Sequence, residues 1–110
     1  MVLKDIETVY GCVVHSQMTD IYHFAISKDK YYLQECIEMF KAIFDIEQDE
    51  NYIENIKKAE DELLKFGVLI VNSEGPYNGL EITRINDLWI LHDDEHAWPV
   101  ILIDYYSWRF

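Results

Sequence analysis

Residues 98–106 of this chain read W-P-V-I-L-I-D-Y-Y, and they give the strongest strand signal in the sequence. β-branched and aromatic side chains such as these favour the extended backbone of a strand. Pro99 stands near the start of the run, where a strand tolerates a missing backbone donor. The segment therefore predicts a long C-terminal strand, and the other elements are placed outward from it.

Three shorter strand-like runs precede this segment, at residues 68–71 (V-L-I-V), 80–84 and 87–92. The first is followed by N-S-E-G-P at residues 72–76, a composition that is typical of turns. The runs succeed one another without a helical pattern between them. They therefore predict consecutive strands that pair antiparallel.

The N-terminal half carries two patterns of helical spacing. The first begins behind Ser27 and Asp29, and the second runs to Gly67 with Asp49 as a plausible N-cap. Gly67 stands where a left-handed residue ends a helix, and Lys65 in the last turn suits the helix dipole. The apolar stripe of the first helix consists of Leu33, Cys36, Ile37, Phe40, Ile43 and Phe44.

Residues 4–17 are ambiguous between a helix and a strand. Their apolar residues recur at helical spacing, but several, such as Val9, are β-branched and fit a strand better. We favour a helix, in which Gly11 would be the weak point. Residues 20–27 (D-I-Y-H-F-A-I-S) alternate as a strand does, with Tyr22, Phe24 and Ile26 on one side.

Together these patterns predict one α+β domain that spans residues 1–110. We expect an antiparallel sheet of about four to five strands, mostly from the C-terminal half, packed by two to three helices from the N-terminal half. No linker, repeat or break in composition divides the chain.

Composition excludes several classes of protein. Half of the 110 residues are hydrophobic, so the chain can fold around a core and is not disordered. It has 9 Lys and Arg against 21 Asp and Glu, a formal net charge of −12. This charge repels phosphate backbones and disfavours nucleic-acid binding, whereas it attracts a basic protein.

The sequence also bears on location and redox state. Asp5 and Glu7 interrupt any apolar run of the kind a secretory signal needs, and no run approaches the length of a membrane span. Cys12 and Cys36 are too few for a disulfide scaffold and are expected to be buried free thiols. We therefore expect a cytoplasmic protein with no cofactor and no membrane partner.

The string His92-Asp93-Asp94-Glu95-His96 matches the H-x-x-E-H pattern of zinc proteases. That chemistry needs a helix, because only there do the two histidines share one face. Here the string stands between two predicted strands, so we interpret it as a solvated hairpin loop. A small metal-dependent enzyme built on His92, Glu95 and His96 remains the alternative.

The other two histidines give weaker evidence of a catalytic site. His15 and His23 stand alone and are expected to be half-buried, hydrogen-bonded side chains rather than catalytic groups. On the favoured helix, Cys12 and His15 would be neighbours, but no third member of a catalytic set is evident. We therefore predict no catalytic residue.

Two acidic segments are the candidate partner-binding sites. The first lacks a basic residue from 45 to 54, and the second is the hairpin loop. Aromatic residues beyond the needs of a core, among them Tyr77, add candidate anchors because Tyr and Trp are enriched at interface hot spots. The predicted partner-binding residues are Asp45, Glu47, Asp49, Glu50, Glu54, Asp61, Tyr77, Asp93, Asp94 and Glu95.

In size and charge over its whole length, the chain is similar in kind to bacterial immunity proteins and antitoxins. The resemblance implies a protein that binds a cationic toxin, most plausibly a nuclease, in a 1:1 complex and blocks its substrate-binding surface. Complementary charge would speed that encounter. An alternative with the same electrostatics is a phage inhibitor that mimics nucleic acid and blocks a host nuclease or DNA-binding complex.

Overall fold

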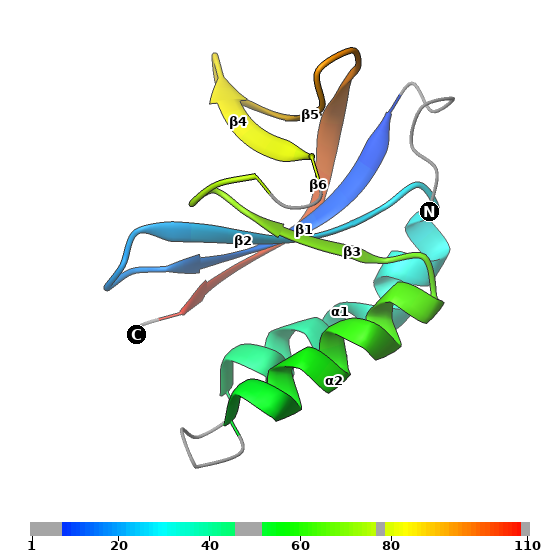
Figure 1. Cartoon of the computed structure of the whole chain (residues 1–110), viewed down its shortest axis with the longest axis vertical. Coiled ribbons are helices and arrows are strands. Elements are labelled where there is room, and N and C mark those ends of the chain that lie inside the picture. Colours follow the sequence, from blue (N-terminus) through cyan, green and yellow to red (C-terminus); the bar gives the residue numbers. More distant parts are fainter. Residues whose placement is uncertain (1–7, 46–51, 77–78, 109–110) are drawn as a thin grey trace.

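A computed structural model describes residues 8–45, 52–76 and 79–108 of the chain (Figure 1). Within these ranges the backbone forms six strands and two helices. In chain order they are β1 (Val9–Ser16), β2 (Ile21–Ser27), α1 (Lys30–Asp45), α2 (Tyr52–Lys65), β3 (Leu69–Asn72), β4 (Glu81–Ile85), β5 (Leu88–His92) and β6 (Ala97–Trp108).

All six strands belong to one sheet, in the order β3-β2-β1-β6-β5-β4. Neighbouring strands pair antiparallel except β1 and β6, which pair parallel at the centre. The expectation of an antiparallel sheet of four to five mostly C-terminal strands with two to three helices is therefore wrong. The described chain has a mixed six-stranded sheet with two helices, because the N-terminal segment adds a strand where a helix was expected.

The predicted helix over residues 4–17 is replaced by strand β1 from residue 9 onward, while residues 4–7 lie outside the described residues. Val9, Val13 and Val14 are fully buried, and β1 is paired along both of its edges. Gly11 permits this arrangement, since a Cβ there would lie 2.6 Å from Cγ1 of Val100 on β6. β-branched side chains and two-sided pairing outweigh the helical spacing.

The sheet curls into a half-barrel with an inner and an outer face. The two strands at opposite ends of the order, β3 and β4, contact each other. The inner face holds one core cluster, which includes Phe24, Trp89 and Trp98. Phe24 and Ile26 of β2 both belong to this cluster and Tyr22 packs against it, so the side predicted for these three residues is confirmed. The outer face at β1 and β2 holds a second cluster with the helices, including Leu33 and Phe40.

The helices cover only part of the outer face. Both pack chiefly against β1, β2 and β3. Figure 1 shows them on one side of these strands, with β4 and β5 at the far end of the molecule. Neither helix in the described part of the chain is long and apolar enough to cross a membrane. The outer face of β4, β5 and the first half of β6 is therefore left without a helix.

The predicted helix ends are confirmed where the structure describes them. The Asp29 carboxylate accepts the backbone N–H of Tyr31 at 2.9 Å and caps α1. Gly67 has a φ of 74°, and the N–H of Val68 donates to the carbonyl of Leu63 at 3.1 Å. This is the left-handed ending that the glycine predicted. The predicted N-cap Asp49 lies outside the described residues.

Candidate partner-binding surface

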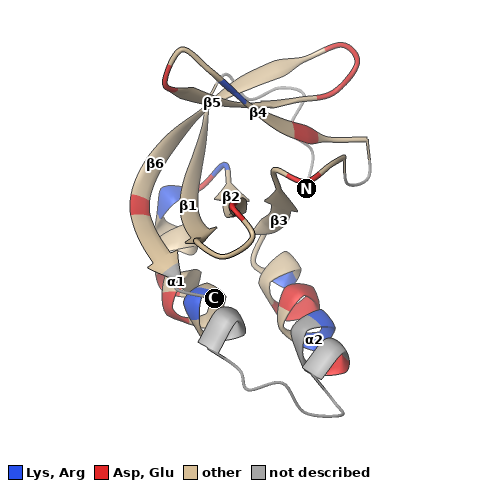
Figure 2. Cartoon of the chain, turned by 90° about the vertical axis from the view of Figure 1, so that its left-hand side faces the viewer, with Lys and Arg blue, Asp and Glu red and all other residues tan. Residues whose placement is uncertain are grey.

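The first predicted acidic segment falls only partly within the described residues. Glu54 and Asp61 are exposed on α2, and Asp45 is the last residue of α1. Lys57 and Lys58 are also exposed on α2, and Figure 2 shows basic and acidic segments side by side along this helix. The charge of α2 is therefore mixed. The remaining predicted residues Glu47, Asp49, Glu50 and Tyr77 lie outside the described residues.

The second predicted segment forms the turn between β5 and β6, as the hairpin interpretation required. The Asp93 carboxylate accepts the backbone N–H of Glu95 at 2.8 Å and that of His96 at 2.6 Å. The hydrogen bond from the Glu95 N–H, followed by that from His96, lowers the pKa of Asp93. Asp93 therefore holds the turn, which makes it a structural residue more than a free charge.

The other two carboxylates of the turn are presented to solvent. Asp94 and Glu95 are exposed at its tip. His96 stacks on the buried Trp98, with ring centroids 5.8 Å apart, and its Nδ1 lies 3.5 Å from the Asp93 carboxylate. Packing below the turn and hydrogen bonds within it thus fix the backbone that carries Asp94 and Glu95.

The two histidines of the H-x-x-E-H string do not form a zinc site of the protease type. The string lies in a strand end and a turn, so the helical geometry that the chemistry needs is missing. The His92 ring hydrogen-bonds the Thr83 hydroxyl at 2.9 Å, whereas His96 faces Asp93. Among the residues that the structure describes, no group of three or more His, Cys, Asp or Glu side chains is placed to hold a metal ion.

Beside the turn lies a surface that the sequence did not reveal, the uncovered outer face of β4, β5 and early β6. We call it the hairpin face. The register forms three cross-strand rows: Glu81 with His92 and Ala97, Thr83 with Ile90 and Pro99, and Ile85 with Leu88. Because Trp89 opposes Val100, the third row continues to Ile101.

The hairpin face is apolar in its third row and acidic toward the turn. Ile85, Leu88 and Ile101 are each about half exposed, at 54%, 54% and 49%. At the opposite end, Glu81 pairs with His92, which directly precedes the turn that carries the exposed Asp94 and Glu95. Exposed branched aliphatic side chains in one contiguous row are uncommon on a surface that contacts only water.

The charge around the hairpin face is almost wholly negative. Arg84 is the only Lys or Arg between residues 79 and 108. Its guanidinium lies 5.6 Å from the ring centroid of Trp89 on the inner face, and Nη2 is 3.6 Å from the Asp87 carboxylate. Figure 2 shows acidic segments at both ends of this layer. Among the described residues, no Lys or Arg nitrogen lies within 4 Å of the carboxylates of the β5–β6 turn.

A second polar cluster lies on the inner face at the end of β1. Nε2 of His15 lies 2.7 Å from the Asp20 carboxylate, and Nδ1 lies 3.2 Å from the Tyr105 hydroxyl. The imidazole also stacks on Tyr22 at 4.1 Å. The predicted half-buried, hydrogen-bonded role of His15 is confirmed. Cys12 belongs to the outer-face cluster, so the expected Cys12–His15 proximity on a helix is wrong.

Both cysteines are buried and unbridged, as predicted. Burial first, and then the charge of Asp104, raises the pKa of Cys12 to about 12. Burial likewise raises the pKa of Cys36. Burial and a raised pKa make both thiols poor nucleophiles near neutral pH.

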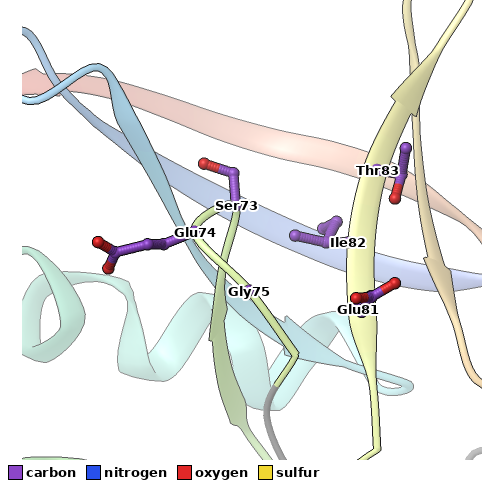
Figure 3. A pocket seen from close by; sticks show the side chains of 6 residues that line it. All are labelled: Ser73, Glu74, Gly75, Glu81, Ile82 and Thr83. Atoms are coloured by element: carbon purple, nitrogen blue, oxygen red, sulfur yellow. The ribbon is translucent and has the colours of Figure 1, made fainter.

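A shallow, open hollow of about 180 Å³ lies between the segment after β3 and the edge of β4 (Figure 3). Figure 3 shows Ile82 projecting toward Ser73, while the side chains of Glu74, Glu81 and Thr83 point away from the gap. The two carboxylates do not face each other across it. The hollow therefore lacks the paired carboxylates that most glycosidases use.

Comparison of this chain with protein-family models, curated proteins and solved structures finds no match.

Proposed function

We propose that this chain is an acidic immunity or antitoxin-type protein, which binds a cationic toxin and blocks the surface that holds the toxin's substrate. A nuclease is the toxin class that fits best, because it must be cationic to hold nucleic acid. The exposed carboxylates Asp94 and Glu95 would take the places of substrate phosphates. The complex would contain one copy of each protein.

One observation carries this proposal: the surplus carboxylates are left uncompensated. Within the described residues, three acidic side chains lie within 4 Å of a Lys or Arg nitrogen, namely Glu62, Asp87 and Asp104. The exposed acids of the β5–β6 turn have no such partner there. A net charge of −12 on so small a body creates a field that steers a basic protein toward it.

A fixed turn backbone suits an inhibitor better than a mobile one. Asp93 organises the turn before any partner arrives, so less conformational entropy is lost when Asp94 and Glu95 are bound. Electrostatic steering raises association rate constants toward about 10⁸–10⁹ M⁻¹s⁻¹ at low salt. A protein that must capture a toxin before the toxin acts benefits from such speed.

The proposal is tested with the protein encoded by the gene that adjoins this one. We expect that protein to be basic and to cleave nucleic acid, and one equivalent of this chain to abolish the cleavage. Cleavage that persists with excess chain, or neighbouring genes that encode no basic protein, would refute an immunity function. Binding to a DNA-binding complex instead would support the nucleic-acid mimic.

Charge reversal locates the site. The paired change Asp94→Lys and Glu95→Lys should slow association by about tenfold or more, since it replaces attraction with repulsion at the contact. The matched control is Glu35→Lys with Glu38→Lys on α1, which alters net charge equally at an exposed place outside the predicted partner-binding residues. Equal slowing by both pairs would mean that net charge alone acts and that the turn is not the site.

A further inference from the structure

The hairpin face presents an apolar row that the charges alone do not explain. Its third row presents Ile85, Leu88 and Ile101 side by side, each about half exposed. The same side of the sheet is covered by α1 and α2 over β1 to β3. Where the helices end, the sheet continues without a cover, and its third row stays apolar.

We infer that the hairpin face is the docking surface for the cationic toxin, with Leu88 and Ile101 as apolar anchors at one end and the carboxylates of the turn at the other. This inference rests on the proposed function and adds to it the surface that determines how long the complex lasts. The partner segment would carry an apolar ridge beside Lys and Arg side chains.

The charge around the hairpin face favours a cationic toxin over a second copy of the chain as its partner. Glu81 and the β5–β6 turn border the face at one end, and Asp87 lies at the tip of the β4–β5 hairpin at the other. The one guanidinium of the layer, that of Arg84, packs over Trp89 on the inner face. Two copies docked by this face would each bring a net charge of −12, which opposes association. Asp87 is already paired with Arg84 at 3.6 Å, so a basic partner meets complementary charge at the end formed by Glu81 and the β5–β6 turn.

The backbone of the hairpin face is also rigid before binding. Asn86 and Asp87 both have positive φ values, of 48° and 68°, which gives the tight turn that matches the twist of a two-stranded hairpin. Trp89 and Leu91 on the opposite side of β5 are buried in the inner core. Leu88 and Ile101 therefore lie on strands whose opposite side is packed in the inner core, and this rigidity favours slow dissociation.

The two parts of the surface act on different rate constants. Charges at the rim govern the rate of association, whereas buried apolar anchors govern the rate of dissociation. Replacement of Leu88 or Ile101 by threonine keeps a strand-forming residue and removes apolar contact area. We expect each change to raise the dissociation rate constant by about tenfold, with the association rate constant unchanged.

The test measures both rate constants for the toxin encoded by the adjoining gene, with wild type, Leu88→Thr, Ile101→Thr and the control Leu102→Thr. Leu102 adjoins Ile101 on β6, is 40% exposed and faces the inner side near Gly11. Denaturation midpoints establish that each variant is folded. Faster dissociation for Leu88→Thr and Ile101→Thr, but not for Leu102→Thr, supports the inference.

Three other outcomes would overturn it, and they are distinguishable. If dissociation is unchanged while the Asp94 and Glu95 reversal still slows association, the docking face is elsewhere and the proposed function stands. If wild type sediments as a dimer that Leu88→Thr converts to a monomer, the face binds a second copy. If the basic neighbour does not bind at all, the proposed function itself fails.

Discussion

Replacement of Gly11 by alanine probes the contact on which the sheet depends. The parallel pairing of β1 with β6 joins the helix-covered strands to the β4–β5 hairpin. A Cβ at Gly11 would lie 2.6 Å from Cγ1 of Val100 and 3.6 Å from Cδ2 of Leu102. Carbon atoms in ordinary contact are about 3.5–4.0 Å apart. Val100 would therefore have to move by roughly 1 Å.

The cost of that movement can be bounded. Val100 is 4% exposed within the inner core, and a valine side chain is stiff about χ1, so it cannot simply turn away. Overpacking of this kind costs about 1–3 kcal/mol. Alanine also restricts the unfolded chain more than glycine does, which stabilises the folded state by about 0.4–1 kcal/mol. We expect a net loss of about 1–2 kcal/mol, or a melting temperature lower by several degrees.

Chemical denaturation of four variants, Gly11→Ala, Val100→Ala, their combination and Gly75→Ala, measures the effect. Gly75→Ala is the control, because a Cβ there meets nothing within 4 Å, and it should change the free energy of unfolding by less than about 0.5 kcal/mol. Gly11→Ala combined with Val100→Ala should cost less than the sum of the single changes, since the second relieves the overlap. A Gly11→Ala variant as stable as wild type, or strict additivity with Val100→Ala, would refute this reasoning.

Three further predictions concern titratable groups. Cys12 and Cys36 should resist a thiol reagent at pH 8 in the folded protein and react on unfolding, because burial raises the pKa of both; prompt labelling of the native protein would contradict their burial. Lys41→Met should lower the free energy of unfolding by about 1 kcal/mol through loss of the 2.6 Å pair with Asp104. That hydrogen bond raises the pKa of Lys41, so the pair should contribute to stability at neutral pH and cease to do so as pH rises through the raised pKa. If Lys41→Met is equally destabilising above that pKa, packing alone accounts for its effect. The lowered pKa of Asp93 means that its contribution is present above the ordinary carboxyl pKa and lost as pH falls below it. Asp93→Ala should therefore flatten the acid side of the stability curve, and an unchanged curve would mean that the turn does not depend on the carboxylate.

The features that could be predicted from sequence are those fixed by near neighbours. Gly67 ends its helix through bonds within a few residues, and the turn at residues 93–96 closes through Asp93 alone. The alternation of β2 and the apolar stripe of α1 likewise depend on local periodicity. Such features need no knowledge of the rest of the fold.

The strand β1 could not be predicted in the same way. Its partner on β6 lies about 90 residues away in the sequence, at Val9 with Val100 and His15 with Ser107. Helical spacing and β-branched content conflict within the segment, and tertiary pairing decides between them. Gly11 weakens a helix, but in this sheet it allows two strands to approach closely.

The hairpin face was missed for a related reason. Alternation along β5 places Trp89 and Leu91 on one side and Leu88 and Ile90 on the other, so the sequence indicates a strand that is apolar on both sides. Such a strand is expected to be buried on both faces. Only the extent of the helices, which stop at β1 to β3, leaves one side uncovered.

The salt dependence of association tests the central claim most directly. The association rate constant of wild-type chain with the toxin encoded by the adjoining gene is measured at ionic strengths where the Debye length is about 30 Å and about 3 Å. Steering by uncompensated carboxylates predicts a fall of about tenfold or more between these conditions, with a much smaller change in dissociation. An association rate constant that is the same at both ionic strengths would contradict the account.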